Sequence, residues 1–267
     1  MSTRDDEIRI VVSGSGLDAT LVSPVAASPG VLFVHGWGGS RQQYLARARE
    51  IASIGCICLT FDLRGHARSE EMKAQVSRED NLADVLAAFD YLCARPDVED
   101  DAIAVVGSSY GGYLAAILTE MRPVRWLALR APALYQDVGW LTPKLQLHKD
   151  QDLPTYRRRH LAAEENRALR ACAAFRGEVL LIESGHDAII PHAVVQSYRE
   201  ACAQARSLTV RTIAEADHGL TDPIWQRAYT RQLANWLGGV ALAARGRQGT
   251  PPDIAGEPES APEVLNK

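Results

Sequence analysis

The sequence predicts an α/β protein in which helices cover both faces of a largely parallel sheet. Short apolar segments typical of strands alternate with longer segments typical of helices along most of the 267 residues. Residues 31–34 are apolar at every position, as expected for a strand that is covered on both faces. Repeated strand–helix units form a parallel sheet between two helical layers, because each crossover lays its helix on one face. The expected architecture is therefore a three-layer sandwich.

The first two expected strands form a hairpin. Residues 7–12 and 19–23 have strand character, and Ser13-Gly14-Ser15-Gly16 between them is rich in turn-forming residues. The later strands are expected where short apolar runs are bounded by turn residues, and the helices where longer mixed segments lie between them. The expected strands are 31–34, 57–61, 103–107, 126–129, 179–182 and 208–213, and the expected helices are 41–53, 81–94, 193–203 and 223–237.

Two segments depart from this alternation. Residues 132–177 lie between two expected strands and are longer than one crossover helix requires, so we expect a small cap-like insertion there. The alternative is a pair of ordinary surface helices with no role as a lid. Residues 246–267 are rich in Pro, Gly and Glu and poor in aromatic residues, which predicts a disordered C-terminal tail. Residues 1–245 then form one domain.

Composition excludes several classes of partner. The formal net charge of −4 gives no basis for binding nucleic acid. The polar N-terminus lacks the apolar core of a signal peptide, and no run of about 18 apolar residues predicts a membrane helix. The five cysteines are odd in number and lack metal or redox spacing, so we expect reduced thiols, no metal and a cytoplasmic protein. The oligomeric state stays open.

The strongest chemical signal is Gly107-Ser108-Ser109-Tyr110-Gly111. It follows the expected strand 103–107 and precedes a segment of helical type, so the order is strand, Gly-x-Ser-x-Gly turn and helix. Such a turn lifts the serine hydroxyl out of the sheet at a helix N-terminus, where free N–H groups favour negative charge. We therefore expect Ser109 to be the nucleophile of an acyl-transfer reaction.

A serine nucleophile needs a base and an acid that orients the base, and both are expected after Ser109 in the chain. Asp187 follows the expected strand 179–182, and His218 follows the expected strand 208–213. Strand ends gather at one edge of a parallel sheet, so both side chains fit the required positions. Asp217 is a rival acid by proximity, but adjacent residues rarely face each other. The other histidines are not expected to be catalytic; they are His35, His66, His148, His160, His186 and His192.

An oxyanion hole requires two backbone donors. The N–H of Tyr110, directly after the nucleophile, is expected to be one of them. The second is expected in His35-Gly36-Trp37-Gly38-Gly39, which follows the strand 31–34 and contains flexible glycines. We expect the N–H of Trp37 to be that donor, with Gly38 as the alternative.

Together these motifs resemble the α/β-hydrolases of the serine esterase and serine aminopeptidase-like group. The matching segments occur in family order and are His35-Gly36-Trp37-Gly38-Gly39, Asp62-Leu63-Arg64-Gly65-His66-Ala67-Arg68-Ser69, 107–112, 185–191 and Asp217-His218. The resemblance implies a mainly parallel eight-stranded sheet and hydrolysis of esters, thioesters or amides without a metal or cofactor. One departure is Ala67, which stands where glycine is common in the family.

Several other residues have two interpretations. Arg64, Arg68 and Arg130 are candidates for binding an acidic substrate, although structural salt bridges are the simpler interpretation. Tyr44, Tyr135 and Trp140 are candidates for lining an acyl pocket, although single aromatic residues more often only pack.

The sequence thus predicts a serine hydrolase that cleaves carboxylic esters of small molecules through an acyl-enzyme on Ser109. The alternative within enzymes is a peptidase or amidase of the serine aminopeptidase-like group; a lipase or an acyltransferase is less favoured. A non-catalytic ligand-binding protein on the same fold is the rival from another class. The complete set of Ser109, Asp187 and His218 argues against it, because a binding protein has no need for all three.

Overall fold

In the computed structural model, which describes residues 3–23 and 28–248, eight strands form one sheet in the order β1-β2-β4-β3-β5-β6-β7-β8. The β1–β2 and β2–β4 pairs are antiparallel, and β3 to β8 are mutually parallel. The predicted mainly parallel eight-stranded sheet is therefore confirmed. The strands are β1 (Arg4–Val12), β2 (Ser15–Ser23), β3 (Ser28–Val34), β4 (Ile57–Phe61), β5 (Val98–Ser108), β6 (Trp126–Arg130), β7 (Glu178–Ser184) and β8 (Ser207–Ile213).

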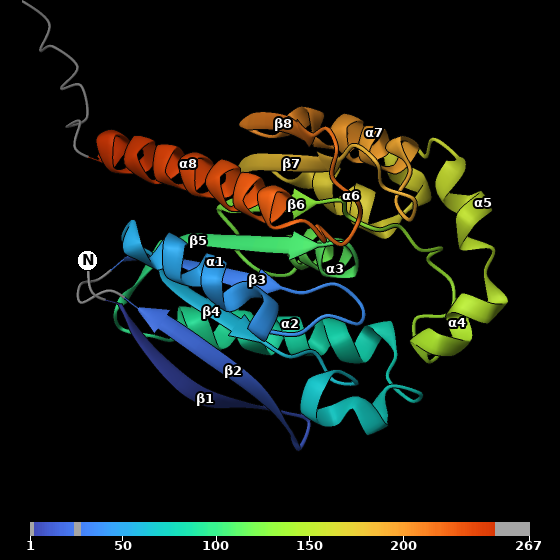
Figure 1. Cartoon of the computed structure of the whole chain (residues 1–267), viewed down its shortest axis with the longest axis horizontal. Helices are drawn as coiled ribbons and strands as arrows, with labels where there is room; N and C mark the ends of the chain where they lie inside the picture. Colours follow the sequence, from blue (N-terminus) through green and yellow to red (C-terminus); the bar gives the residue numbers. More distant parts are fainter. Residues whose placement is uncertain (1–2, 24–27, 249–267) are drawn as a thin grey trace, which may run out of the picture.

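Helices cover both faces of the sheet, as the three-layer prediction requires. In Figure 1, α1 and α8 lie in front of the sheet, and their buried side chains form one core cluster with it. The side chains of α2, α3, α6 and α7 form a second core cluster on the other face. The helices are α1 (Gln42–Ser53), α2 (Arg78–Cys93), α3 (Tyr110–Leu118), α4 (Lys144–Asp150), α5 (Leu153–Arg158), α6 (Arg167–Ala174), α7 (His192–Ala201) and α8 (Pro223–Gln248).

Strand β3 shows why an all-apolar strand belongs at the centre of this sheet. Successive side chains of a strand point to opposite faces. Leu32 and Val34 therefore pack in the core beneath α2 and α3, and Val31 and Phe33 pack in the core beneath α1 and α8. Burial on both faces removes any advantage of polar residues at alternate positions.

The N-terminal hairpin is tighter than predicted. Strands β1 and β2 pair along their whole length, and only Ser13 and Gly14 connect them. Both residues have positive φ, 48° and 80°, as a two-residue type I′ turn requires. Ser15 and Gly16, which were expected in the turn, belong to β2.

Helix α2 begins before its predicted start, because a capping box at Ser77 stabilises its first turn. The Ser77 hydroxyl accepts the Asp80 N–H, and the Asp80 carboxylate accepts the Ser77 N–H, which forms a capping box. Arg78, in the first turn, is fully buried and donates to the carbonyl of Gln136 (2.8 Å) and the hydroxyl of Tyr113 (3.1 Å). This arginine ties α2 to the start of the predicted insertion.

The predicted insertion 132–177 consists of two different parts. Helices α4 and α5 lie at the edge of the molecule, beyond the carboxyl ends of the strands (Figure 1). Helix α6 instead buries Leu169 and Cys172 in the core cluster of α3, so it belongs to a helical layer. Only the part before α6 projects from the sandwich.

Helix α8 continues to Gln248, well beyond its predicted end at residue 237. Gly238 and Gly239 favour a helix end, but Val240, Ala241 and Ala244 all pack against the core cluster of α1. Tertiary packing therefore outweighs the low helix propensity of the two glycines. Residues 246–248 of the predicted tail are helical, and the rest of it, 249–267, lies outside the described residues.

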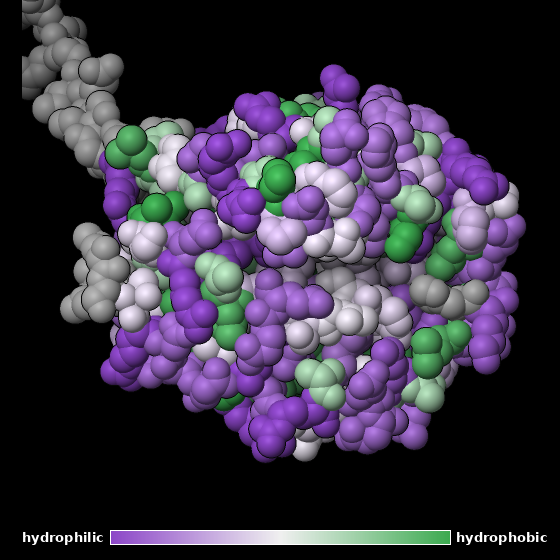
Figure 2. All heavy atoms as spheres, viewed as in Figure 1, coloured by the Kyte–Doolittle hydropathy of each residue, from purple (hydrophilic) through white to green (hydrophobic). Residues whose placement is uncertain are grey.

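The surface seen from the side of α1 and α8 is mostly hydrophilic, with small separate apolar patches (Figure 2). Within the described part of the chain, no helix combines the length and apolar character needed to cross a bilayer. Across the same residues, no group of three or more His, Cys, Asp or Glu side chains is arranged to hold a metal ion.

Ala67, the exposed first residue of a short 3-10 helix (Ala67–Met72), is strained, since its φ of 50° lies in the left-handed region. We expect Ala67→Gly to raise the free energy of unfolding by roughly 0.5 kcal/mol, because relief of strain exceeds the added chain entropy. Ala87→Gly, inside α2, should lower it by about 1 kcal/mol. Urea unfolding measures both changes, and a loss of stability in both variants would contradict the strain at position 67.

Candidate active site

Ser109 occupies a sharp turn between β5 and α3. Its backbone has φ 53° and ψ −117°, and its N–H donates to the carbonyl of Arg130 (2.9 Å) on the neighbouring strand. The turn brings α3 so close to β3 that a Cβ on Gly111 would lie 2.2 Å from the carbonyl oxygen of Val34. A Cβ on Gly107 would lie 2.4 Å from the carbonyl oxygen of Gly111. Both motif glycines are therefore required by close approach.

Three segments far apart in the sequence bring the predicted catalytic side chains together. His218 Nε2 lies 3.0 Å from Ser109 Oγ, and His218 Nδ1 lies 2.7 Å from Asp187 Oδ2. A carboxylate only accepts hydrogen bonds, so Nδ1–H donates to Asp187 and Nε2 is free to accept the Ser109 O–H. The Asp187 side chain is 3% exposed and that of His218 is 19% exposed. The imidazole thus faces the serine with its basic nitrogen.

The environment of Asp187 keeps its carboxyl group ionised. Burial raises the pKa of this carboxyl, but the hydrogen bond with His218 and the N–H groups of Ile189 and Ile190 together lower the pKa below its usual value. These two N–H groups lie 2.9 Å and 2.8 Å from Oδ1. The second carboxylate oxygen is therefore left for the imidazole.

The alternative acid Asp217 and the histidines near Asp187 have other partners. Asp217 accepts hydrogen bonds from the N–H and the hydroxyl of Thr221, so its carboxylate serves the loop after β8. His192 pairs with Glu183, and both His186 and His192 are exposed. None of these three residues contacts Ser109 among the hydrogen bonds of residues 3–23 and 28–248.

A buried histidine holds the loop that carries Trp37. His35 Nε2 accepts the N–H of Leu63 (3.0 Å), so Nδ1 carries the proton and donates to the carbonyl of Gly36 (2.8 Å). Burial lowers the pKa of His35 to about 4, so the ring is neutral at physiological pH. The loop therefore has a fixed path past Ser109.

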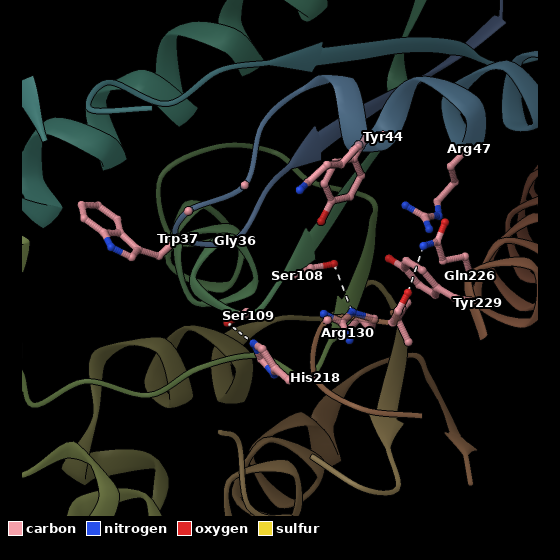
Figure 3. Close-up of a pocket in the computed structure, with 15 residues that line it drawn as sticks. Gly36, Trp37, Tyr44, Arg47, Ser108, Ser109, Arg130, His218, Gln226 and Tyr229 are labelled. Atoms are coloured by element: carbon pink, nitrogen blue, oxygen red, sulfur yellow. Dashed lines mark hydrogen bonds between the residues drawn. The ribbon is translucent and has the colours of Figure 1, made fainter. Parts of the chain in front are cut away.

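The two predicted oxyanion donors belong to two segments next to Ser109. Tyr110 starts α3, and Trp37 belongs to the β3–α1 loop that lines the cavity next to the serine. The Trp37 indole points away from Ser109 (Figure 3) and packs edge-on against the Tyr110 ring, with 5.6 Å between centroids. Packing of these side chains fixes both backbones relative to each other.

The sequence analysis did not identify the contacts of Lys144 with the aromatic residues next to Ser109. This fully buried residue begins α4, and its Nζ lies 4.3 Å, 4.5 Å and 4.7 Å from the ring centroids of Trp37, Tyr110 and Tyr135. Burial lowers the pKa of Lys144 well below its usual value. The projecting segment thus contacts the predicted oxyanion loop. No local motif marks this contact, because its members come from four separate segments.

The arginines considered in the sequence have different roles. Arg64 forms a buried ion pair with Asp84 (2.6 Å), and Arg68 lies 3.6 Å from Asp18. Both are structural pairs. Arg130 instead donates to the hydroxyls of Ser108 (3.5 Å) and Ser184 (3.1 Å) and forms no ion pair with any residue that the structure describes.

A cavity of about 350 Å³ lies between α1 and α8, beside Ser109 and His218 (Figure 3). Tyr44 lines it, whereas Tyr135 and Trp140 pack in the aromatic cluster around Tyr113 on the other face of the sheet. The full lining is Gly36, Trp37, Gly38, Gly39, Gln43, Tyr44, Arg47, Ser108, Ser109, Arg130, His218, Gly219, Leu220, Gln226 and Tyr229.

Comparison with known proteins places this chain among serine hydrolases with the α/β-hydrolase fold. Residues 40–242 match the prolyl oligopeptidase family. An uncharacterised protein of Mycobacterium tuberculosis is 28% identical over 186 residues, which cover 69% of this chain and 61% of that relative, so the chain spans less than two thirds of its length.

Two solved structures share the fold at low sequence identity. An esterase of Pyrococcus furiosus is 17% identical, with a TM-score of 0.67 over 88% of this chain and 90% of its own. An acylaminoacyl peptidase of Pyrococcus horikoshii is 17% identical, with a TM-score of 0.67 over 88% of this chain and 41% of its own. The resemblance to α/β-hydrolases is confirmed.

The neutral, buried state of His35 predicts acid-sensitive stability. The unfolded ring takes up a proton near pH 6.5 and the folded ring only near pH 4, so the unfolded state binds more protons between these values. Lowering the pH through this window should therefore cost the folded state up to about 3 kcal/mol.

Urea unfolding between pH 7 and pH 4 tests this expectation. His35→Gln should reduce the pH dependence relative to wild type, and His66, whose pKa burial also lowers to about 4, should account for part of what remains. His192→Gln, at an exposed site, should preserve the wild-type dependence. An unchanged slope in His35→Gln would show that His35 does not carry the effect.

Proposed function

Because this chain belongs to the prolyl oligopeptidase family of serine hydrolases, we propose that it cleaves carboxylic esters of small molecules through an acyl-enzyme on Ser109. The observation that carries this proposal is the series of hydrogen bonds from Ser109 through His218 to Asp187. The cavity beside Ser109, about 350 Å³, has a volume suited to a small acyl group.

The proposed reaction has two steps. Ser109 Oγ attacks the ester carbonyl carbon while its proton moves to His218 Nε2, and the alcohol then leaves with that proton. Water next attacks the acyl-enzyme, gives a proton to His218 and releases the carboxylic acid, which restores the Ser109 hydroxyl. Asp187 stabilises the imidazolium in both steps, and its lowered pKa supports this role.

The N–H groups of Trp37 and Tyr110 are the proposed oxyanion hole. Each such donor contributes about 3–4 kcal/mol to transition-state stabilisation in known serine hydrolases. Two observations support their pre-organisation: His35 holds the loop before Trp37, and Ser109 places Tyr110 at the start of α3.

Amide or peptide cleavage is the second candidate. The family match and the likeness in fold to an acylaminoacyl peptidase favour it. The same groups would act, with His218 giving its proton to an amine instead of an alcohol. Relative turnover of an ester and its matched amide decides between the two candidates.

Ser109→Ala tests the nucleophile. We expect turnover of a p-nitrophenyl ester series, from acetate to long acyl chains, to fall by about 10⁵–10⁶-fold with little change in the unfolding midpoint. Wild-type turnover in this variant would refute the assignment. Phosphonate labelling of Ser109 without ester turnover would favour amides, and neither labelling nor turnover would favour a binding protein.

A pair of matched variants tests the acid. Asp187→Asn should lower kcat by about 10⁴-fold, because the imidazole loses the acceptor that fixes its tautomer. Asp217→Asn removes the carboxylate next to His218 in the chain but should keep kcat near wild type, since Asp217 bonds to Thr221. Equal losses in both variants would contradict the distinct role of Asp187.

A further inference from the structure

Arg47, on α1, is held in the cavity wall and forms no ion pair with any of the described residues. It is 9% exposed, and its guanidinium lies 4.3 Å from the ring centroid of Tyr229 and 5.3 Å from that of Tyr44. Its Nε donates to the Thr230 hydroxyl (3.1 Å). Its two terminal nitrogens donate to no residue in the described ranges.

Arg130 lines the same cavity directly beside the nucleophile. It pairs in register with Ser108 across β5 and β6, and its carbonyl accepts the Ser109 N–H. The residue is 6% exposed, and its side chain bonds only to the hydroxyls of Ser108 and Ser184 among the described residues. In Figure 3 the guanidinium lies between His218 and Tyr229.

These two arginines differ from the other buried arginines that the structure describes. Arg64 pairs with the Asp84 carboxylate, and Arg78 and Arg157 donate to backbone carbonyls. Among the described residues, the side chains of Arg47 and Arg130 donate hydrogen bonds only to hydroxyl groups. A buried cation is costly unless an anion or strong acceptors compensate it, so these two charges favour an anionic partner in the cavity that they line.

The rest of the cavity wall also offers hydrogen-bond donors. Its lining residues include no Asp or Glu. They include Gln43, whose amide oxygen accepts the Ser40 N–H, and Gln226, whose amide nitrogen donates one hydrogen bond to the Leu220 carbonyl. The Tyr229 side chain is buried in the same wall. Burial raises the pKa of Tyr229, while the charges of Arg47 and Arg130 act in the opposite direction, so both cations lie near its hydroxyl.

We propose that this cavity binds an anionic group of the substrate, and that the preferred substrates are monoesters of short dicarboxylic acids. Arg130 and Arg47 would bind the free carboxylate while the ester carbonyl lies at Ser109. A phosphate would be recognised by the same donors. This inference rests on the proposed function, because it takes Ser109 as the nucleophile.

The first test compares an anionic ester with a neutral ester of the same carbon chain. The ratio of kcat/KM for monomethyl glutarate to that for methyl valerate, followed in a pH-stat, should exceed 10 in wild type. Arg47→Gln and Arg130→Gln should each lower this ratio at least 10-fold. Arg49→Gln is the matched control, since it removes an exposed arginine from the same helix, paired with Asp5 outside the cavity, and should keep the ratio.

Thermal unfolding shows whether each variant folds. If Arg130→Gln does not fold, Arg130→Lys replaces it; this variant keeps the charge and should retain part of the preference for the anionic ester. A wild-type ratio of 1 or below, or equal ratios in wild type and Arg47→Gln, would overturn the proposal.

The second test measures binding without turnover. Isothermal titration of Ser109→Ala with glutarate and with inorganic phosphate should detect binding that Arg47→Gln weakens at least 10-fold. Tighter binding of phosphate would identify a phosphorylated substrate and overturn the assignment of a carboxylate. Anion binding without Ser109-dependent ester turnover would support the anion site and refute the esterase function. Ser109-dependent turnover of neutral esters without anion binding would support the esterase function and refute the anion site.

Discussion

The candidate site depends on the strained backbone of Ser109. Its positive φ turns the chain from β5 into α3 within one residue, and its N–H is bonded to β6. Such a conformation persists only where the surroundings over-determine it. Here Gly107 and Gly111 allow β5, α3 and β3 to approach at distances that no side chain permits. The rigidity of the central parallel strands therefore sets the position of the serine hydroxyl.

The groups around this serine come from loops at the carboxyl ends of different strands. In a parallel sheet these ends share one edge, so Asp187, His218 and Trp37 converge without any long-range sequence signal. Each loop is then fixed by its own hydrogen bonds: two N–H groups hold Asp187, and the neutral ring of His35 holds the loop before Trp37. The sheet supplies proximity, and these local bonds supply orientation.

Charge is distributed unequally around the nucleophile. On the side of α2, two buried arginines are compensated: Arg64 by Asp84, and Arg78 by backbone carbonyls. On the side of α1 and α8, the side chains of Arg47 and Arg130 donate hydrogen bonds only to hydroxyl groups among the described residues. Because an uncompensated buried charge is costly, this asymmetry favours binding of an anion on the second side only. Arg47 and Arg130 line the same cavity as Ser109 and His218, so the proposed anion site adjoins the candidate catalytic residues.

The sequence by itself determined the parallel sheet, the elbow at Ser109 and the chain order of Asp187 and His218, because these depend on local pattern and on the ends of strands. It left the role of Arg130 open and missed the capping box of Ser77, the extension of α8 and the contacts of Lys144. Tertiary structure decided the extension of α8 and the contacts of Lys144, and it also decided which arginines form ion pairs. The physical reason is that packing and charge compensation join residues far apart in the chain, and no local pattern records which side chains meet.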